Sequence, residues 1–484
     1  MTHRVPQRRR ENALVKVQSL SALRKRAAGA SGGGATPTPG VLPTYAGRGS
    51  RAADSSVTIA DIRLAEPKTT QPAAPTSRLE RRALALMTDT AANALLGIVF
   101  WAAAARLYSP AEVGRGSALI SAATLLATLS QLNLGNVYAR FLGSAGHRQR
   151  RLVFAGFGVV AGLAILLGTV YATLGPSSVL FASSGQAWAF PFCVAVLAVF
   201  VLQDMILVSL GKASWVPVEN ISWGIVKLVV LVALATSLPE LGIGLAWILP
   251  AVVAAVAVTG YLALRRWRAE PGKVAFPTRR DLGKEIAGEY VTGLISTAVP
   301  LALPLLVVHI LGLEANAYFA VPWLFATSLS LLMWNVAAVL LVEASAAPER
   351  RPVLLKKALR LALAVAVAGG VAIWFLGPLI LSILGSGYAE HSTWLLRCTA
   401  VSAPAVAVVV VWTTAARSAG RIRRVMVLQL AIGAVLIGLA AALIGRVGVV
   451  GVGIAYLTAQ VGAAVVLIRP LATMIRPKRL SRRR

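Results

Sequence analysis

Long apolar runs, each ended by a short polar break, recur about twelve times between Ala83 and Ala472. An α-helix needs roughly 20 apolar residues to cross the hydrocarbon core of a bilayer. A soluble domain has no need of that pattern, so we predict an all-α membrane protein with about 12 transmembrane helices. The predicted spans are 83–107, 116–142, 152–175, 187–211, 215–238, 241–264, 285–311, 316–343, 357–384, 394–416, 422–445 and 448–472.

Basic residues lie in alternate loops of this pattern. The loops after even-numbered spans carry lysine and arginine, whereas the loops after odd-numbered spans carry little beyond Arg115 and Arg446. Loops rich in Lys and Arg remain on the cytoplasmic side of a membrane. We therefore predict a multi-pass protein of the cell (cytoplasmic) membrane with both termini in the cytoplasm.

The longest internal loop, a predicted cytoplasmic linker over 265–284, divides the spans into six and six. We predict an N-lobe over 83–264 and a C-lobe over 285–472, related as parallel repeats because each half has an even number of spans. Residues 1–82 are rich in Gly, Pro and Ser, which predicts a disordered basic cytoplasmic tail, and 473–484 form a second basic tail. For Leu14 to Leu23, a short amphipathic helix lying on anionic lipid is the alternative.

The composition agrees with a membrane protein and excludes several other classes. Hydrophobic residues make up 57% of the chain, charged residues 14%, and the formal net charge is +30. This charge lies in the tails and alternate loops, where it sets topology, so we expect membrane lipids and not nucleic acid as partners. Two cysteines and four scattered histidines predict no disulfide framework or metal site. The sequence has no GxxxxGK[ST] loop and no paired acid and base, so we expect neither a cofactor nor an enzyme.

Charged side chains inside the predicted spans need a reason, because an ionisable group deep in the bilayer costs on the order of 3 kcal/mol. The carboxylates lie near the cytoplasmic ends of their spans. They either reach headgroup water and loop arginines, or they have a function. These carboxylates are Asp89, Asp204, Glu219 and Glu289, and amide side chains accompany them at Asn93 and Asn220.

Lys227 differs because it lies near the middle of the fifth span. Glu219, Trp223 and Lys227 follow one another at four-residue spacing, which places them on one helix face. Two interpretations stay open. Lys227 forms a buried ion pair with Glu219 or Asp204 that only fixes packing, or it presents a cation to a wet central cavity.

Three short motifs carry a resemblance to a known family. They are Ala105–Gly114 (ARLYSPAEVG), Leu132–Gly135 followed by Arg140, and Leu311–Phe319 (LGLEANAYF) in the second half. These motifs resemble those of polysaccharide and lipid-linked oligosaccharide flippases of the O-antigen type, within the MATE-like multidrug/oligosaccharidyl-lipid/polysaccharide exporter superfamily. The resemblance covers about residues 83–472. The chain departs from the lipid II flippase pattern in having about twelve predicted spans instead of fourteen.

The resemblance implies two six-helix lobes that work by alternating access. They would carry an undecaprenyl-pyrophosphate-linked glycan, or a similar lipid-linked sugar, to the outer leaflet for cell-envelope polysaccharide biosynthesis. Cationic side chains would then meet the pyrophosphate, and carboxylates would bind a coupling H⁺ or Na⁺. The cavity candidates are Arg106 and Arg140 from the motifs and Lys227, Asn93 and Asn220 from the spans; the coupling-ion candidates are Asp89, Asp204, Glu219 and Glu289.

Two alternatives to a flippase remain. The first is a multidrug antiporter coupled to H⁺ or Na⁺, which requires an acidic cavity and makes Asp89 or Asp204 essential and Lys227 dispensable. The second is a membrane scaffold without transport, which recruits envelope glycan-synthesis proteins through the basic N-terminal tail. The sequence does not distinguish the glycan, the lipid carrier or the coupling ion.

Overall fold

The structure is a computed structural model, and it describes residues 93, 95–142, 145–175, 177–212, 214–265, 267, 279–346 and 348–475. All regular structure in these residues is helical. The predicted tail over 1–82, most of the predicted linker over 265–284, and residues 476–484 of the second tail lie outside them. Asp89, in the first part of the predicted first span, lies outside them too.

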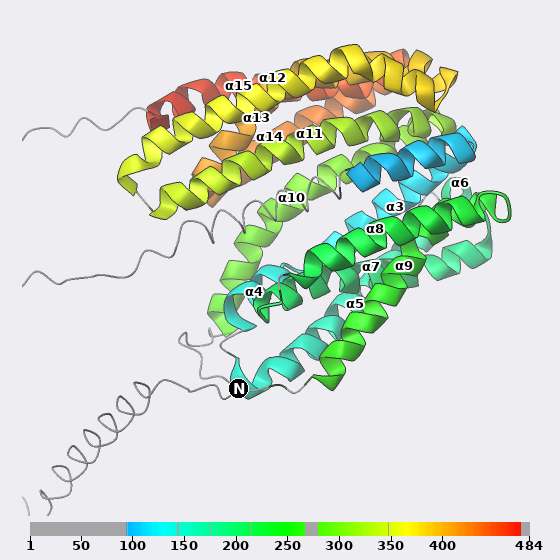
Figure 1. Ribbon diagram of the computed structural model, residues 1–484, viewed down its shortest axis with the longest axis horizontal. Coiled ribbons are helices and arrows are strands. Elements are labelled where there is room, and N and C mark those ends of the chain that lie inside the picture. Colours follow the sequence, from blue (N-terminus) through cyan, green and yellow to red (C-terminus); the bar gives the residue numbers. More distant parts are fainter. Residues whose placement is uncertain are drawn as a thin grey trace, which may run out of the picture. The chain divides into compact units, whose positions relative to one another are not determined.

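Apart from the second span and the short helix α6, the helices of the first half correspond to the predicted spans (Figure 1). An unlabelled helix, Leu95–Leu107, precedes them. They are α3 (Pro110–Ser130), α4 (Leu134–Phe141), α5 (Gln149–Leu174), α6 (Ser177–Leu180), α7 (Ser184–Ser209), α8 (Trp215–Leu234) and α9 (Pro239–Leu264), with a 3₁₀ turn η2 at Gly146–Arg148.

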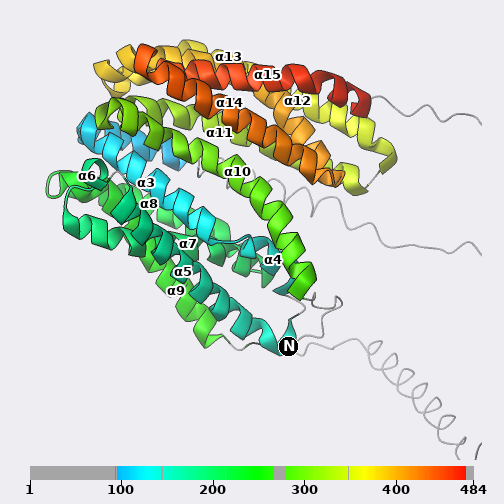
Figure 2. The same ribbon diagram turned by 180° about the vertical axis from the view of Figure 1, so that it is seen from behind.

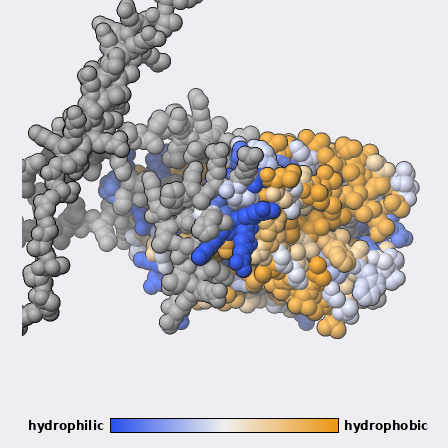
Figure 3. Space-filling model, turned by 90° about the horizontal axis from the view of Figure 1, so that it is seen from below, coloured by the Kyte–Doolittle hydropathy of each residue, from blue (hydrophilic) through white to orange (hydrophobic). Residues whose placement is uncertain are grey.

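The second half contains α10 (Arg279–Leu311), α11 (Leu313–Ala346), α12 (Arg351–Leu384), α13 (Ser386–Ser418), α14 (Ile422–Val447) and α15 (Val450–Ile475), with a 3₁₀ turn η3 at Pro348–Arg350. Within the described residues, 11 helices are long and apolar enough to cross a membrane, and Leu95–Leu107 is a shorter apolar helix. Together they confirm the predicted all-α membrane fold with about twelve spans. Figure 3 shows the broad hydrophobic surface that these helices present.

The second predicted span, 116–142, is not one helix in the structure. The helix α3 begins earlier, at Pro110, because Ser109 and Glu112 form a capping box in which each side chain accepts a hydrogen bond from the other residue's backbone N–H. It ends at Ser130, and Leu132 and Asn133 then adopt positive φ angles of 47° and 59°. This left-handed turn separates α3 from α4, because residues in that conformation cannot continue a right-handed helix.

Each half has a hydrophobic core of its own. One core lies among α3, α5, α7 and α9 and includes Val160, Ala198 and Leu202. The other lies among α10 to α15 and includes Ala362 and Val411. Figure 2 shows the two groups of helices from behind, with α10 running from one toward the other. The halves therefore pack as two lobes.

Candidate functional site

The two lobes meet where α3 and α11 begin. Asn316, on α11, is fully buried, and its side-chain amide donates hydrogen bonds of 2.8 Å to the Gly114 carbonyl and of 2.8 Å to Ser117 Oγ. Ser117 in turn donates to the Gly114 carbonyl at 3.0 Å. A buried amide that satisfies two acceptors on the other lobe fixes the register of the two helices.

Gly114 permits this contact because it has no side chain. A Cβ atom at this position would lie 1.7 Å from the Leu313 carbonyl oxygen and 3.3 Å from the Ala317 nitrogen. Both neighbours are backbone atoms of α11, which cannot turn aside as a flexible side chain can. The glycine that closes the first motif is therefore a contact point between the lobes.

A hydrophobic cluster extends this interface. It contains Phe100, Tyr108 and Ile243 from the first lobe and Tyr318 and Leu384 from the second, and all of them are buried. The Tyr108 hydroxyl donates a 2.7 Å hydrogen bond to the Leu231 carbonyl, which ties the first motif to α8. We call this set the interlobe cluster. It lies at the same end of the lobes as the Asn316 hydrogen bonds.

Lys227 lies next to the interlobe cluster, because it contacts Phe100, which belongs to that cluster. Its ammonium nitrogen is 3.9 Å from the ring centroid of Trp223, 4.2 Å from that of Trp247 and 5.3 Å from that of Phe100. Only 4% of the residue is exposed. We call the three rings the aromatic cage. Phe100 belongs to both the cage and the interlobe cluster, so Lys227 is one side chain away from the contact between the lobes.

The cage is rigid because its rings contact one another. The indoles of Trp223 and Trp247 meet edge to face at 4.9 Å, and the Trp223 indole N–H donates to the Trp247 carbonyl at 3.3 Å. Phe100 contacts Trp247 at 5.5 Å. Among the described residues Lys227 forms no ion pair, so its recorded contacts are with aromatic faces. Such contacts stabilise a desolvated cation by about 2 kcal/mol or more.

Two of the predicted coupling-ion carboxylates, Glu219 and Asp204, lie on the neighbouring helices α8 and α7 of this lobe. Glu219, on α8, has both carboxylate oxygens buried without a hydrogen-bond partner, and it interacts electrostatically with Asp204 on α7. Next to Asp204, Gln203 donates to the Ala255 carbonyl at 2.9 Å and to Thr259 Oγ1 at 2.7 Å. Glu219 and Asp204 therefore form a second polar group, which the structure does not join to Lys227 by an ion pair.

The other predicted site residues are dispersed. Arg106 is exposed at the end of the Leu95–Leu107 helix, and Asn93 and Asn220 are half-buried. Arg140 lies in α4 and Glu289 in α10, and the side chains of both are outside the described part of the structure. Among the described residues no group of three or more His, Cys, Asp or Glu side chains could hold a metal ion.

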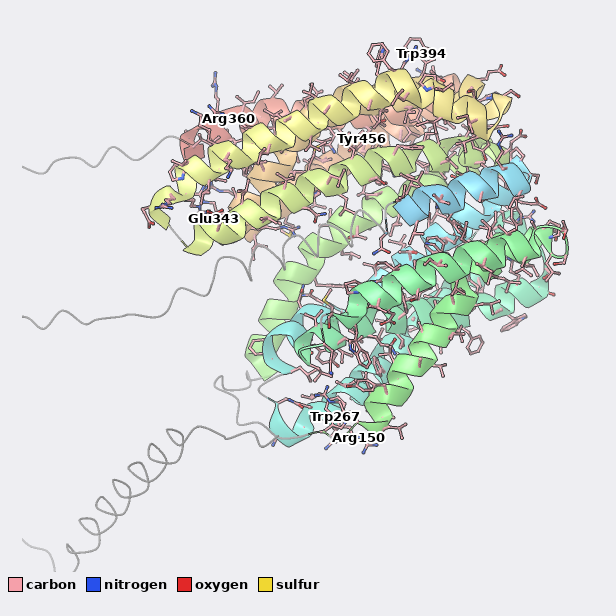
Figure 4. The ribbon with its side chains drawn as sticks, in the orientation of Figure 1. Arg150, Trp267, Glu343, Arg360, Trp394 and Tyr456 are labelled. Carbon is pink, nitrogen blue, oxygen red and sulfur yellow. The ribbon has the colours of Figure 1, made fainter. Side chains whose placement is uncertain are left out.

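Two cavities lie within the lobes. A cavity of about 390 Å³ between α3, α7 and α9 is mostly apolar and shares Trp247 with the aromatic cage. A second, of about 270 Å³, lies between α10, α11, α13, α14 and α15, and its polar lining includes Ser330 and Gln460. Figure 4 shows Tyr456, which also lines it, inside the second lobe.

Sequence reasoning missed most of this site. Trp223 is predictable because it is one helical turn from Lys227, but Phe100 and Trp247 come from other helices and follow no local pattern. Asn316 lies inside the motif Leu311–Phe319. The spacing of that motif does not distinguish a residue that contacts the other lobe from one that caps a helix.

No family model matches the sequence, and no curated protein matches it significantly. Several solved structures do share the fold. An inward-facing multidrug resistance MATE family transporter of the MOP superfamily is 15% identical, with a TM-score of 0.61 over 79% of this chain and 94% of that one. The lipid II flippase MurJ in its inward closed conformation is 13% identical, with a TM-score of 0.62 over 81% of this chain and 90% of that one. An outward-facing multidrug resistance MATE family transporter is 15% identical, with a TM-score of 0.54 over 82% and 95%. The chain therefore has the MATE-like fold of a multi-pass membrane protein.

Proposed function

We propose that the protein is a transporter that moves a lipid-linked oligosaccharide or polysaccharide precursor from the inner to the outer leaflet by alternating access. Two lobes with separate cores, joined at one end by the Asn316 hydrogen bonds and the interlobe cluster, suit a rocking motion. We infer from the positive-inside pattern that the joined end lies outside the cell, so that this conformation would open to the cytoplasm.

The observation that carries this proposal is the state of Lys227. It is a buried cation in the middle of a span, one side chain from the lobe interface, and among the described residues no carboxylate pairs with it. The aromatic cage offsets part of its desolvation and leaves the positive charge uncompensated. A pyrophosphate that passes between the lobes would find an attractive potential there, whereas a cationic drug would be repelled.

We propose that Glu219 and Asp204 couple this transport to protons. Carboxyl groups inside membrane-spanning helices often form proton relays in pumps and transporters. The same two carboxylates also favour the second candidate, a multidrug antiporter, because such an antiporter needs acidic side chains in its cavity. The chain has the fold of solved MATE transporters, which agrees with this candidate too. A scaffold that acts through the tail over 1–82 is the third candidate.

The test is lipid-linked glycan accumulation in cells depleted of the protein, complemented with Lys227→Ala. Lys212→Ala is the matched control, because Lys212 also lies over an indole, Trp215, at 5.3 Å, but at the end of the span. We expect wild type and Lys212→Ala to relieve the accumulation and Lys227→Ala to leave at least about a tenfold excess, the scale of losing one charge-assisted contact. Lys227→Arg, which keeps the charge, should restore part of the activity.

Other outcomes select the other candidates. Full rescue by Lys227→Ala would show that Lys227 and its aromatic cage are not needed for transport. Depletion without accumulation, together with raised sensitivity to cationic drugs that Asp204→Asn does not correct, would identify an antiporter. Loss of function on deletion of residues 1–78 alone, with transport intact in reconstituted vesicles, would identify the scaffold.

A further inference from the structure

A second cation held by aromatic rings lies in the other lobe, on the face away from the lobe interface. The guanidinium of Arg397, on α13, is 5.0 Å from the ring of Trp374 on α12 and 5.0 Å from the ring of Trp394. Its Nε is buried and has no hydrogen-bond partner. No ion pair of Arg397 is recorded among the described residues, so two indole faces hold a cation that lacks a counter-ion.

An apolar groove lies beside this cation, and the two share Trp374. It encloses about 290 Å³ between α12 and α13, and Trp374 forms part of its wall. The helices approach closely at two glycines, because a Cβ on Gly370 would lie 2.9 Å from the Ala400 carbonyl oxygen and one on Gly377 would lie 2.4 Å from Leu396. Trp374 lies between these glycines in the sequence, so the bulky indole rises from a stretch of close backbone packing.

The groove faces outward and not into the protein. Val371, Phe375 and Val401, which line it, are exposed by 52%, 71% and 53%. Trp394 is also exposed, and in Figure 4 it points away from the helices, far along the lobe from Arg360. Exposed apolar side chains on a membrane helix contact lipid chains.

The depth of Arg397 matches the edge of the hydrocarbon layer. About 20 positions separate it from Arg417 in the last turn of α13, which corresponds to about 30 Å of helix and to the thickness of that layer. The groove runs from Arg397 toward the end where α13 finishes, because Val401 and Pro404 line it and Arg417 follows them. A lipid with its phosphate at Arg397 would therefore lay an acyl chain along the groove.

We propose that this groove is a binding site for one anionic phospholipid of the leaflet at the Arg397 end, with the phosphate bound by the Arg397 guanidinium between the two indoles. The planar guanidinium presents paired donors that match phosphate oxygens. The tryptophans hold it in place and lie at the headgroup level, where aromatic residues are enriched. This site is separate from Lys227 and does not depend on the proposed transport function.

The test is native mass spectrometry of the full chain in mild detergent, titrated with phosphatidylglycerol. Arg397→Gln should weaken the binding of the first lipid about tenfold, the scale of losing a charge-assisted hydrogen bond. Arg360→Gln is the matched control, since it removes an arginine from the other end of the same helix pair. Val401→Trp fills the groove, leaves Arg397 in place and should weaken binding as well.

The outcomes separate a lipid site from two simpler accounts. Equal loss in Arg397→Gln and Arg360→Gln would mean general attraction of anionic lipid to basic residues and would overturn the proposal. Equal competition by glycerol phosphate without acyl chains would mean a phosphate site that does not use the groove, which also overturns it. Val401→Trp alters an exposed side chain, so it tests the groove even if Arg397→Gln does not fold.

Discussion

At the residue scale, the site contains residues of a type that is uncommon at their positions. Lys227 is a buried cation that pairs with no carboxylate in the part of the chain that the structure describes, and Gly114 is a glycine inside a helix. Each exception has a physical cause in another helix. Aromatic faces surround the cation, and the backbone of α11 occupies the place of a side chain at the glycine.

Gly114→Ala should destabilise the joined end of the lobes. Its methyl group would collide with the Leu313 carbonyl, and overpacking of this kind costs on the order of 1–3 kcal/mol. We expect a lower midpoint of thermal unfolding in detergent, or, if the lobes separate instead, greater reactivity of a cysteine placed at Ser117. Gly158→Ala is the control, because no atom lies within 4 Å of its added Cβ. Identical behaviour of the two variants would show that the α3–α11 contact is absent in solution.

At the element scale, α10 is the helix that belongs to both lobes. Near its start, the Tyr290 hydroxyl donates to the Leu129 carbonyl of α3. Farther along, Val299 packs against Gly433 of α14 so closely that a Cβ there would lie 2.7 Å away. Pro300 and Pro304 follow inside the helix, and each removes a backbone hydrogen bond. A helix weakened at this point can bend when one lobe moves relative to the other.

Replacing Pro300 and Pro304 together by alanine should slow transport while stabilising the fold. Alanine restores two helical hydrogen bonds, and proline in a helix interior costs about 3 kcal/mol relative to alanine. We expect transport in reconstituted vesicles to fall about tenfold with no fall in the unfolding midpoint. Pro470→Ala in α15 alters a helix that packs in the core of the second lobe and should leave the rate unchanged. An unchanged rate in the double variant would exclude α10 as a bending element.

At the scale of the whole molecule, two cores are joined at one end. In the proposed alternating-access cycle this end opens for part of the time, and the Asn316–Ser117 contact of 2.8 Å then breaks. The interlobe cluster, which contains Tyr108 and Tyr318, must separate in the same step. Burial of such a cluster stabilises the joined state, and substrate or proton binding has to supply the difference.

A disulfide between Ser117→Cys and Asn316→Cys should trap this state. The experiment replaces Cys193 and Cys398 by alanine, because both are free thiols. Oxidation should abolish transport and reduction should restore it, whereas each single cysteine variant should transport under both conditions. Full transport by completely cross-linked protein would mean that the lobes do not separate between α3 and α11.

The sequence by itself determined the all-α membrane fold with about twelve spans. Hydropathy over twenty residues is a local property, so the spans are readable without knowing what they contact. The Ser109–Glu112 capping box is also local, since it joins residues three positions apart, but the predicted span began at 116 and did not include it. The position of Lys227 near the middle of a span also follows from the local sequence, and in the structure the aromatic cage surrounds this residue.

Only the tertiary structure decided what surrounds these residues. The cage joins Phe100, Trp223 and Trp247 from three helices, and Asn316 reaches a partner about two hundred residues away. Contacts of that length leave no period in the sequence, because packing is specified by shape and not by spacing. Arg397 shows the same limit: the span predicted over 394–416 includes it near one end, but its contact with the indole of Trp374 on another helix follows from packing alone.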